Sequence, residues 1–129
     1  MRKLAAILIG TALAAAPAAA ERLSPEAELA RALEGRVAGE PVDCIDLQRV
    51  RGSRVIPGAA IIWDAGSIVY VNRPDSGADS LNRWDSMLTR TMTGRLCSVD
   101  TVTMVDAPSR MMTGVVMLGE FVPYRRAGD

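Results

Sequence analysis

The pattern of apolar and polar positions changes at about residue 42. Upstream, Ser24 and the Pro-Glu pair after it form a typical helix start, with serine as N-cap, proline at the first helical position and a carboxylate in the first turn. Leu29 and Leu33 lie one turn apart between charged residues, and Gly35 ends the pattern. The sequence predicts one helix with a narrow apolar stripe, lying on the surface of a larger body.

From residue 42 onward, short β-rich segments alternate with turn residues. The segments are 54–57, 60–63, 68–71, 101–105 and 114–118. The connections 64–67 (Asp-Ala-Gly-Ser) and 106–110 (Asp-Ala-Pro-Ser-Arg) are typical of hairpins. Segment 68–71 is apolar on both alternating faces, which predicts a central strand, whereas segment 101–105 predicts a strand with one face in water. The pattern predicts a mainly β domain, a small antiparallel β-barrel or sandwich, with the helix in front of it.

Two stretches are less regular. Leu81, Trp84 and Leu88 follow helical spacing, but threonines come after them, so we expect a short helical turn and then a strand that ends near Gly94. The tail 121–124 should be extended, because its proline cannot donate a backbone hydrogen bond, and the chain from residue 125 onward should be loose.

The first twenty residues are typical of a secretory signal peptide. Two basic residues precede an apolar run, 4–16, which is too short to span a bilayer of about 30 Å, and small residues follow it. We expect cleavage before Glu21, with a cut after Ala16 as the alternative. The prediction is a single domain, 21–129, that is periplasmic or secreted and has no membrane span after cleavage.

Cys44 and Cys97 are the only cysteines. A secretory signal directs them to an oxidising compartment, so a structural disulfide is predicted. It would close a loop of 53 residues (97 minus 44) and stabilise the fold by about 4 kcal/mol in the chain-entropy model. The chain has no Cys-x-x-Cys pair and no histidine, which argues against a metal or redox site.

Composition excludes several functions. The leader holds two of the 15 basic residues and none of the 15 acidic ones, so 13 arginines face 15 carboxylates in the domain, a net charge of −2. That balance argues against nucleic-acid binding. Without histidine there is no Ser-His-Asp triad, and without a lysine in the domain there is no Schiff base. No phosphate-binding glycine loop occurs, and we predict neither a cofactor nor a metal.

Asp75-Ser-Gly-Ala resembles the active-site signature of aspartic proteases, and Met117-Leu-Gly resembles the segment that braces their active-site loop. Two features argue against this interpretation. Arg73 and Pro74 stand where such enzymes have a buried apolar strand, and the 44 residues from Asp75 to Gly119 leave little room for a flap. We therefore predict a turn, with a retropepsin-like homodimer that uses Asp75 as the alternative.

Methionines are frequent near the second hairpin. We expect them to fill the core, the commoner use of methionine, with an adaptable binding surface or a soft metal site as the alternatives. The residues are Met104, Met111, Met112 and Met117.

Four strings of the sequence support a resemblance. They are PVDCIDLQRV (41–50), YVNRPDSGADSLNRWD (70–85), LCSVDTV (96–102) and LGEFVPYRR (118–126). Over residues 33–126 the chain resembles a group of short secreted proteins of unknown function from sphingomonad-type alphaproteobacteria. In that group arginine commonly stands where this chain has Asp75, which further weakens the protease interpretation. The resemblance implies secretion and a small β fold, and it implies no activity.

We predict a non-enzymatic binding or envelope-associated module whose partner is an envelope protein or a small ligand. Loops held on rigid strands tend to carry recognition, so the binding surface should be the loop 72–80 with the tryptophan beside it. The candidate binding residues are Asn72, Arg73, Ser76, Gly77 and Trp84. An alternative is an inhibitor of a cell-wall hydrolase or protease, because small disulfide-bonded β modules with a Ser-Gly-Ala loop occur among lysozyme inhibitors.

Overall fold

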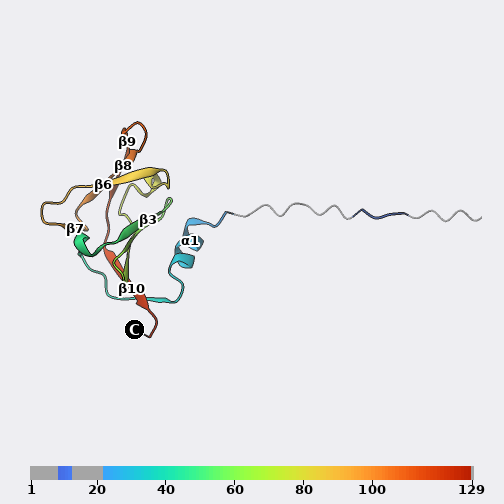
Figure 1. Ribbon diagram of the computed structural model, residues 1–129, viewed down its shortest axis with the longest axis horizontal. Coiled ribbons are helices and arrows are strands. Elements are labelled where there is room, and N and C mark those ends of the chain that lie inside the picture. Colours follow the sequence, from blue (N-terminus) through green and yellow to red (C-terminus); the bar gives the residue numbers. More distant parts are fainter. Residues whose placement is uncertain (1–8, 13–21, 129) are drawn as a thin grey trace, which may run out of the picture.

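The computed structural model describes residues 9–12 and 22–128, and most of the predicted leader with its cleavage site lies outside these residues. The described chain is mainly β, as predicted, with one α-helix before the strands (Figure 1). The elements are α1 (Pro25–Ala32), β1 (Arg36–Ala38), β2 (Cys44–Asp46), β3 (Gly52–Ile56), β4 (Ala60–Asp64), β5 (Ile68–Asn72), β6 (Asp85–Thr89), β7 (Arg95–Cys97), β8 (Thr101–Asp106), β9 (Met112–Met117) and β10 (Phe121–Arg126), with short 3-10 turns at Leu47–Arg49 and Ala78–Ser80.

The strands form three antiparallel sheets. The largest has the order β1-β10-β5-β4-β3, the second β6-β8-β9, and the third pairs β2 with β7. The sheets are not closed into a barrel, so of the two predicted architectures the barrel is wrong and the sandwich stays the prediction. Strand β5 lies in the middle of its sheet, as its two apolar faces predict.

The five-stranded sheet separates two hydrophobic clusters. Because side chains alternate along a strand, Ile61 and Trp63 of β4 enter the larger cluster and Ile62 enters the smaller one. The larger cluster joins all three sheets, and within it the rings of Trp63 and Phe121 lie 5.5 Å apart. The smaller cluster lies under α1, which contributes the buried Leu29. The helix therefore covers one face of the main sheet, and the two small sheets pack against the other.

The helix begins as predicted and ends early. The Ser24 hydroxyl oxygen accepts a hydrogen bond from the backbone N–H of Ala27 at 3.2 Å. The helix ends at Ala32, and Gly35, at φ +74°, lies in the turn that leads to β1. Both predicted hairpins are present, 64–67 between β4 and β5 and 106–110 between β8 and β9.

The stretch 80–91 differs from its prediction. The helical turn precedes Leu81 instead of including Trp84, and β6 ends at Thr89, five residues before Gly94. The Asn82 side-chain oxygen accepts hydrogen bonds from the backbone N–H groups of Trp84 and Asp85 at 3.0 and 2.9 Å. This local turn prevents a helix here and delivers the chain into β6.

The prediction of a loose end from residue 125 is wrong, because β10 extends to Arg126 and pairs with β1 on one side and β5 on the other. Pro123 fits between these neighbours because β1 ends beside it. The Pro123 carbonyl oxygen accepts a hydrogen bond from the N–H of Gly39 at 2.7 Å, just after β1. The missing proline N–H therefore interrupts no strand pairing there.

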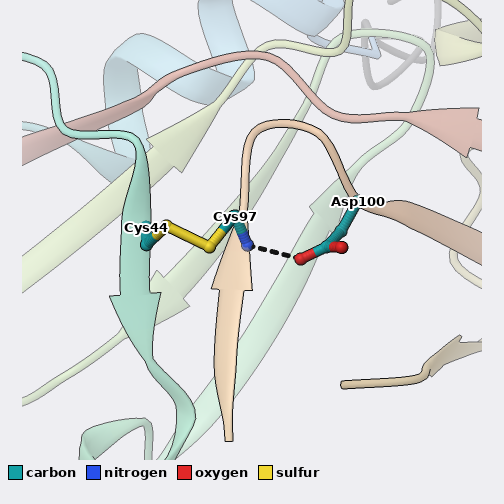
Figure 2. The surroundings of a disulfide bond; sticks show 3 residues. All are labelled: Cys44, Cys97 and Asp100. Atoms are coloured by element: carbon teal, nitrogen blue, oxygen red, sulfur yellow. Dashed lines mark hydrogen bonds between the residues drawn. A yellow bond between two sulfur atoms is a disulfide. The ribbon is translucent and has the colours of Figure 1, made fainter. Parts of the chain in front are cut away.

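The predicted disulfide joins Cys44 and Cys97, which face each other on β2 and β7 (Figure 2). The Asp100 carboxylate accepts a hydrogen bond from the N–H of Cys97 at 2.7 Å and so closes the turn after β7 (Figure 2). The bond lies within the two-stranded sheet and links β2 to β7 across 53 positions of the chain.

Candidate functional site

The predicted binding loop begins at a buried asparagine. The Asn72 side chain is fully buried, its amide nitrogen donates to the Gly119 carbonyl oxygen at 2.7 Å, and its oxygen accepts from the Gly119 N–H at 2.9 Å. Both polar atoms of the side chain are thus used to join the end of β5 to the connection between β9 and β10. That Asn72 also binds a ligand stays a prediction.

The middle of the loop is attached to β9. The Ser76 carbonyl oxygen accepts a hydrogen bond from the N–H of Met117 at 3.0 Å. Gly77 has φ +82°, and a side chain there would collide with the backbone carbonyl of Val115. The loop therefore lies against the edge of β9, where its conformation is set by backbone contacts.

Arg73 lies on the surface, where its guanidinium makes two hydrogen bonds to the Glu26 carboxylate of α1, at 2.7 and 3.0 Å. The pair raises the pKa of Arg73 and lowers that of Glu26, chiefly through these hydrogen bonds. Trp84 differs from the rest of the predicted set, because 86% of its surface is exposed and its ring projects from the turn before β6. Trp84 lines a large cleft that no residue of the loop 72–80 borders.

That cleft, of about 780 Å³, lies between α1 and the turn that carries Trp84. It contains four arginines and one carboxylate, a net charge of +3. The residues that define this arginine cleft are Arg22, Glu28, Arg31, Arg54, Arg83 and Trp84. They come from the segment before α1, from α1 itself, from β3 and from the 82–84 turn. Sequence reasoning missed the four arginines, because no local spacing connects residues from separate segments.

Glu28 organises the arginine cleft. Its carboxylate accepts hydrogen bonds from Arg83 and, at 3.4 Å, from Arg54, and only 13% of its side chain is exposed. The hydrogen bond from Arg83, supported by Arg54, lowers the pKa of Glu28. Glu28 thus positions two guanidinium groups and stays ionised at neutral pH.

A groove of about 490 Å³ continues from the arginine cleft between β3 and β6. Arg54 and Arg83 line both spaces, so the two are contiguous. The Asp85 carboxylate lies at the groove, where hydrogen bonds from Asn82 and then Thr113 lower its pKa.

Asp75 lies on another part of the surface. It borders a cleft of about 590 Å³ together with Asp43, Glu120 and Arg73, which makes that cleft acidic. The N–H of Asp75 donates to the Met117 carbonyl oxygen at 3.0 Å, so the loop and the segment that resembles a protease brace are in contact. The charged surface is therefore divided, with an excess of arginine beside α1 and an excess of carboxylate beside Asp75.

The methionine prediction is confirmed for Met104, which is fully buried, and is wrong for the other three, which are exposed. Met117 lies on the outer face of the β6-β8-β9 sheet with Leu88 and Val115, while Met111 and Met112 stand at the adjoining hairpin. Val102, Met104 and Val116 occupy the inner face, so the buried positions of this sheet are already filled.

Within residues 9–12 and 22–128, no three carboxylate or cysteine side chains gather as a metal site would require. Over the same residues, none of the helices has the length and apolarity needed to cross a bilayer. Comparison with models of protein families, with curated proteins and with solved structures finds no match to this chain.

Proposed function

We propose that the protein is a non-enzymatic binding module of the periplasm or secreted space, and that it takes an anionic partner in the arginine cleft. The observation that carries the proposal is the local excess of charge. Four arginines and one glutamate surround the cleft, although acidic and basic residues are equal in number over the whole chain. Guanidinium groups bind carboxylates and phosphates through paired hydrogen bonds, which makes an anion the complementary partner.

Trp84 supports a binding role for the same surface. An exposed tryptophan leaves a large apolar area in water, and interfaces are enriched in tryptophan and arginine together. Its backbone N–H is held by Asn82, so the ring stands on a defined turn beside Arg83. A partner that pairs with the arginines would cover this ring as well.

The chemistry of the cleft favours binding over catalysis. Its single carboxylate, Glu28, is hydrogen-bonded to two arginines that lower its pKa, whereas a general acid or base at neutral pH needs a raised pKa. The titratable side chains that line the cleft are otherwise arginines, which stay protonated.

Titration with two short peptides tests the proposal. We expect hexaglutamate to bind saturably and to change the fluorescence of Trp84, and hexalysine to do neither. Arg31→Glu with Arg83→Glu should weaken hexaglutamate binding by about tenfold or more. Arg73→Gln, a change to an arginine outside the cleft, is the matched control, and isothermal titration of Trp84→Phe separates the optical signal from affinity. Equal binding of both peptides, or an unchanged affinity in the double variant, would contradict the proposal.

An enzyme that this protein inhibits would be one kind of anionic partner. Purified protein can be assayed against a panel of cell-wall hydrolases and proteases. If it slows one of them, and Arg31→Glu with Arg83→Glu abolishes the effect, that enzyme is the partner. If none is slowed, the inhibitor hypothesis is rejected, and the binding proposal then rests on the peptide titration alone.

An aspartic protease is the second candidate, favoured by one observation, the contact of Asp75 with the Met117–Gly119 segment. Such an enzyme needs two copies that bring their Asp75 carboxylates together and share a proton. Acid-dependent cleavage of a peptide library by a dimer, lost in Asp75→Asn, is the expected result. A monomeric protein with no such cleavage would remove this candidate.

A further inference from the structure

Within the part of the chain that the structure describes, strands β3 and β6 each leave one edge without a neighbouring strand. The main sheet ends at β3, whose one partner is β4, and the three-stranded sheet ends at β6, whose one partner is β8. Each is five residues long, and neither contains the prolines or lysines that commonly protect an exposed edge.

The opposite edges of the same sheets are protected. On the main sheet, β1 is only three residues long. On the three-stranded sheet, Asp75 and Ser76 bond to the backbone of Met117 and so cover the end of β9. The contrast singles out β3 and β6.

The two open edges face one groove. Residues 53–55 of β3 and 85–87 of β6 line it from opposite sides. Val55 and Met87 pack against the larger hydrophobic cluster and give the groove an apolar floor. Backbone N–H and C=O groups at the open edges of β3 and β6 thus border a groove with an apolar floor. An added β-strand binds in this kind of environment.

The arginine cleft adds charge to one side of this groove. Arg54 alternates with Val55 along β3, so its guanidinium lies on the other face, toward Glu28 of α1. Arg83 joins it there. An extended chain in the groove would therefore meet apolar side chains on one face and guanidinium groups on the other.

We propose that this groove binds an extended acidic segment of a partner protein as an added β-strand, which joins the β3 and β6 edges into one continuous sheet. About five residues of the partner match the length of the two edges. Alternate side chains of the segment are apolar, over Val55 and Met87, and acidic, toward Arg54 and Arg83. This inference rests on the proposed function, since it assigns the anionic partner to an extended protein segment.

The test uses a fluorescent peptide, Ser-Glu-Val-Glu-Val-Glu-Ser, and the unaltered protein. A peptide methylated at its valine amide nitrogens, and a second methylated at its glutamate amide nitrogens, keep every side chain but lose donors toward one edge. Because a strand between two edges pairs on both sides, each methylated peptide should bind at least tenfold more weakly. At a peptide concentration of ten times Kd, hydrogen exchange should slow by about tenfold at the amides that face the two open edges, those of Ser53 and Val55 on β3 and of Met87 on β6.

Protein variants provide a second measurement. Ser53→Pro removes a backbone donor at the β3 edge and Ser53→Ala keeps it, so we expect the first to weaken binding and the second to leave it unchanged. Trp63, which is buried, reports by its fluorescence whether each variant folds. The methylated peptides leave the protein unaltered, so the test stands even where the proline variant does not fold.

Each result decides the question. Slower exchange at both edges with weak binding of both methylated peptides supports strand addition. Slower exchange at one edge alone overturns it. So does a methylated peptide that binds as tightly as the unmethylated peptide. One mixed result is that methylation leaves the affinity of the peptide unchanged while Arg31→Glu with Arg83→Glu still lowers it. In that case strand addition fails and the proposed arginine cleft survives. If methylation abolishes binding while the arginine variants have no effect, the cleft fails and strand addition is supported. Protection of both edges without peptide in a concentration-dependent dimer would assign the groove to a second copy and overturn the proposal.

Discussion

Asn72 and Gly119 lie 47 residues apart in the chain and exchange two hydrogen bonds, from the Asn72 amide to the Gly119 carbonyl oxygen at 2.7 Å and from the Gly119 N–H to the Asn72 side-chain oxygen at 2.9 Å. Gly119 is buried and approaches the Arg73 backbone so closely that a side chain at 119 would collide with it. This junction holds the loop 73–77 against the β9–β10 connection, and with it the position of Asp75.

Asn72→Ala should therefore destabilise the protein. It leaves a buried N–H and a buried carbonyl of Gly119 without partners, at a cost of about 2–4 kcal/mol. The midpoint of urea unfolding, followed by the fluorescence of Trp63, measures the change. Asn82→Ala, which removes an amide from a partly exposed turn, serves for comparison and should cost less. Equal losses of stability in the two variants would show that burial of the Asn72–Gly119 hydrogen bonds adds nothing to their contribution.

Gly77→Ala and Gly58→Ala form a matched pair. Both glycines have positive φ, +82° and +73°, but only at Gly77 would the new Cβ meet the Val115 carbonyl, while the space around Gly58 is open. We expect about 1 kcal/mol of destabilisation at Gly58, from backbone strain, and about 2–4 kcal/mol at Gly77, where close packing adds to the strain. Thermal or urea unfolding of both variants checks the difference, and a smaller loss at Gly77 than at Gly58 would contradict the close approach of the loop to β9.

Stability should fall as the solution is acidified. The folded-state pKa of Glu28 is lowered from 4.5 by its arginine hydrogen bonds, so ionised Glu28 stabilises the folded state above about pH 4.5. That contribution is lost as the pH falls through the lower folded-state value. Glu26 and Asp85 are shifted in the same direction and add to the effect.

Urea midpoints between pH 7 and pH 3 test this dependence. Glu28→Gln should be less stable than the wild type at pH 7 and should lose less stability on acidification. Glu34→Gln, at an exposed carboxylate just after α1, is the control and should follow the wild type. A Glu28→Gln profile parallel to that of the wild type would show that the arginine pairing does not stabilise the fold.

Removal of the disulfide should cost about 4 kcal/mol, the value of the chain-entropy model for a closed loop that spans 53 positions. Cys44→Ala with Cys97→Ala measures it without a reductant, and free-thiol labelling of the denatured wild type should find no reactive cysteine. A double variant as stable as the wild type would mean that the β2–β7 pairing holds these segments without the bond.

Much of the fold was predictable because its signals are local. The Ser24 cap and the proline after it define the start of α1, and period-two alternation distinguishes the central β5 from the half-exposed β8. The predictions that were wrong concern residues whose structure depends on contacts between distant parts of the chain. Arg125 continues the strand because β1 and β5 flank it, and Arg126 because it pairs with β1, while Pro123 is accommodated only because β1 ends at its side.

The candidate site was predictable only in part. Trp84 was predicted as a binding residue from its position beside a loop; the structure places it in the lining of a large cleft, and its role in binding stays a prediction. The predicted roles of Asn72, Ser76 and Gly77 in binding stay predictions, and the structure gives each of them contacts within the fold. A loop that is free in solvent and a loop that is bonded to a neighbouring strand have similar turn residues. The choice of turn residues depends on φ and on local hydrogen bonds, not on tertiary contacts of the loop.

The sequence by itself determined the helix start, the two hairpins, the mainly β class and the single cysteine pair, since each depends on spacing within a few residues or on there being only two cysteines. Only the tertiary structure decided which strand edges stay open and which arginines converge. Arg54 and Arg83 meet at Glu28, and Arg31 lines the same cleft, because α1 packs over β3 beside the turn into β6. Such convergence follows from long-range strand pairing and packing, which no local spacing encodes.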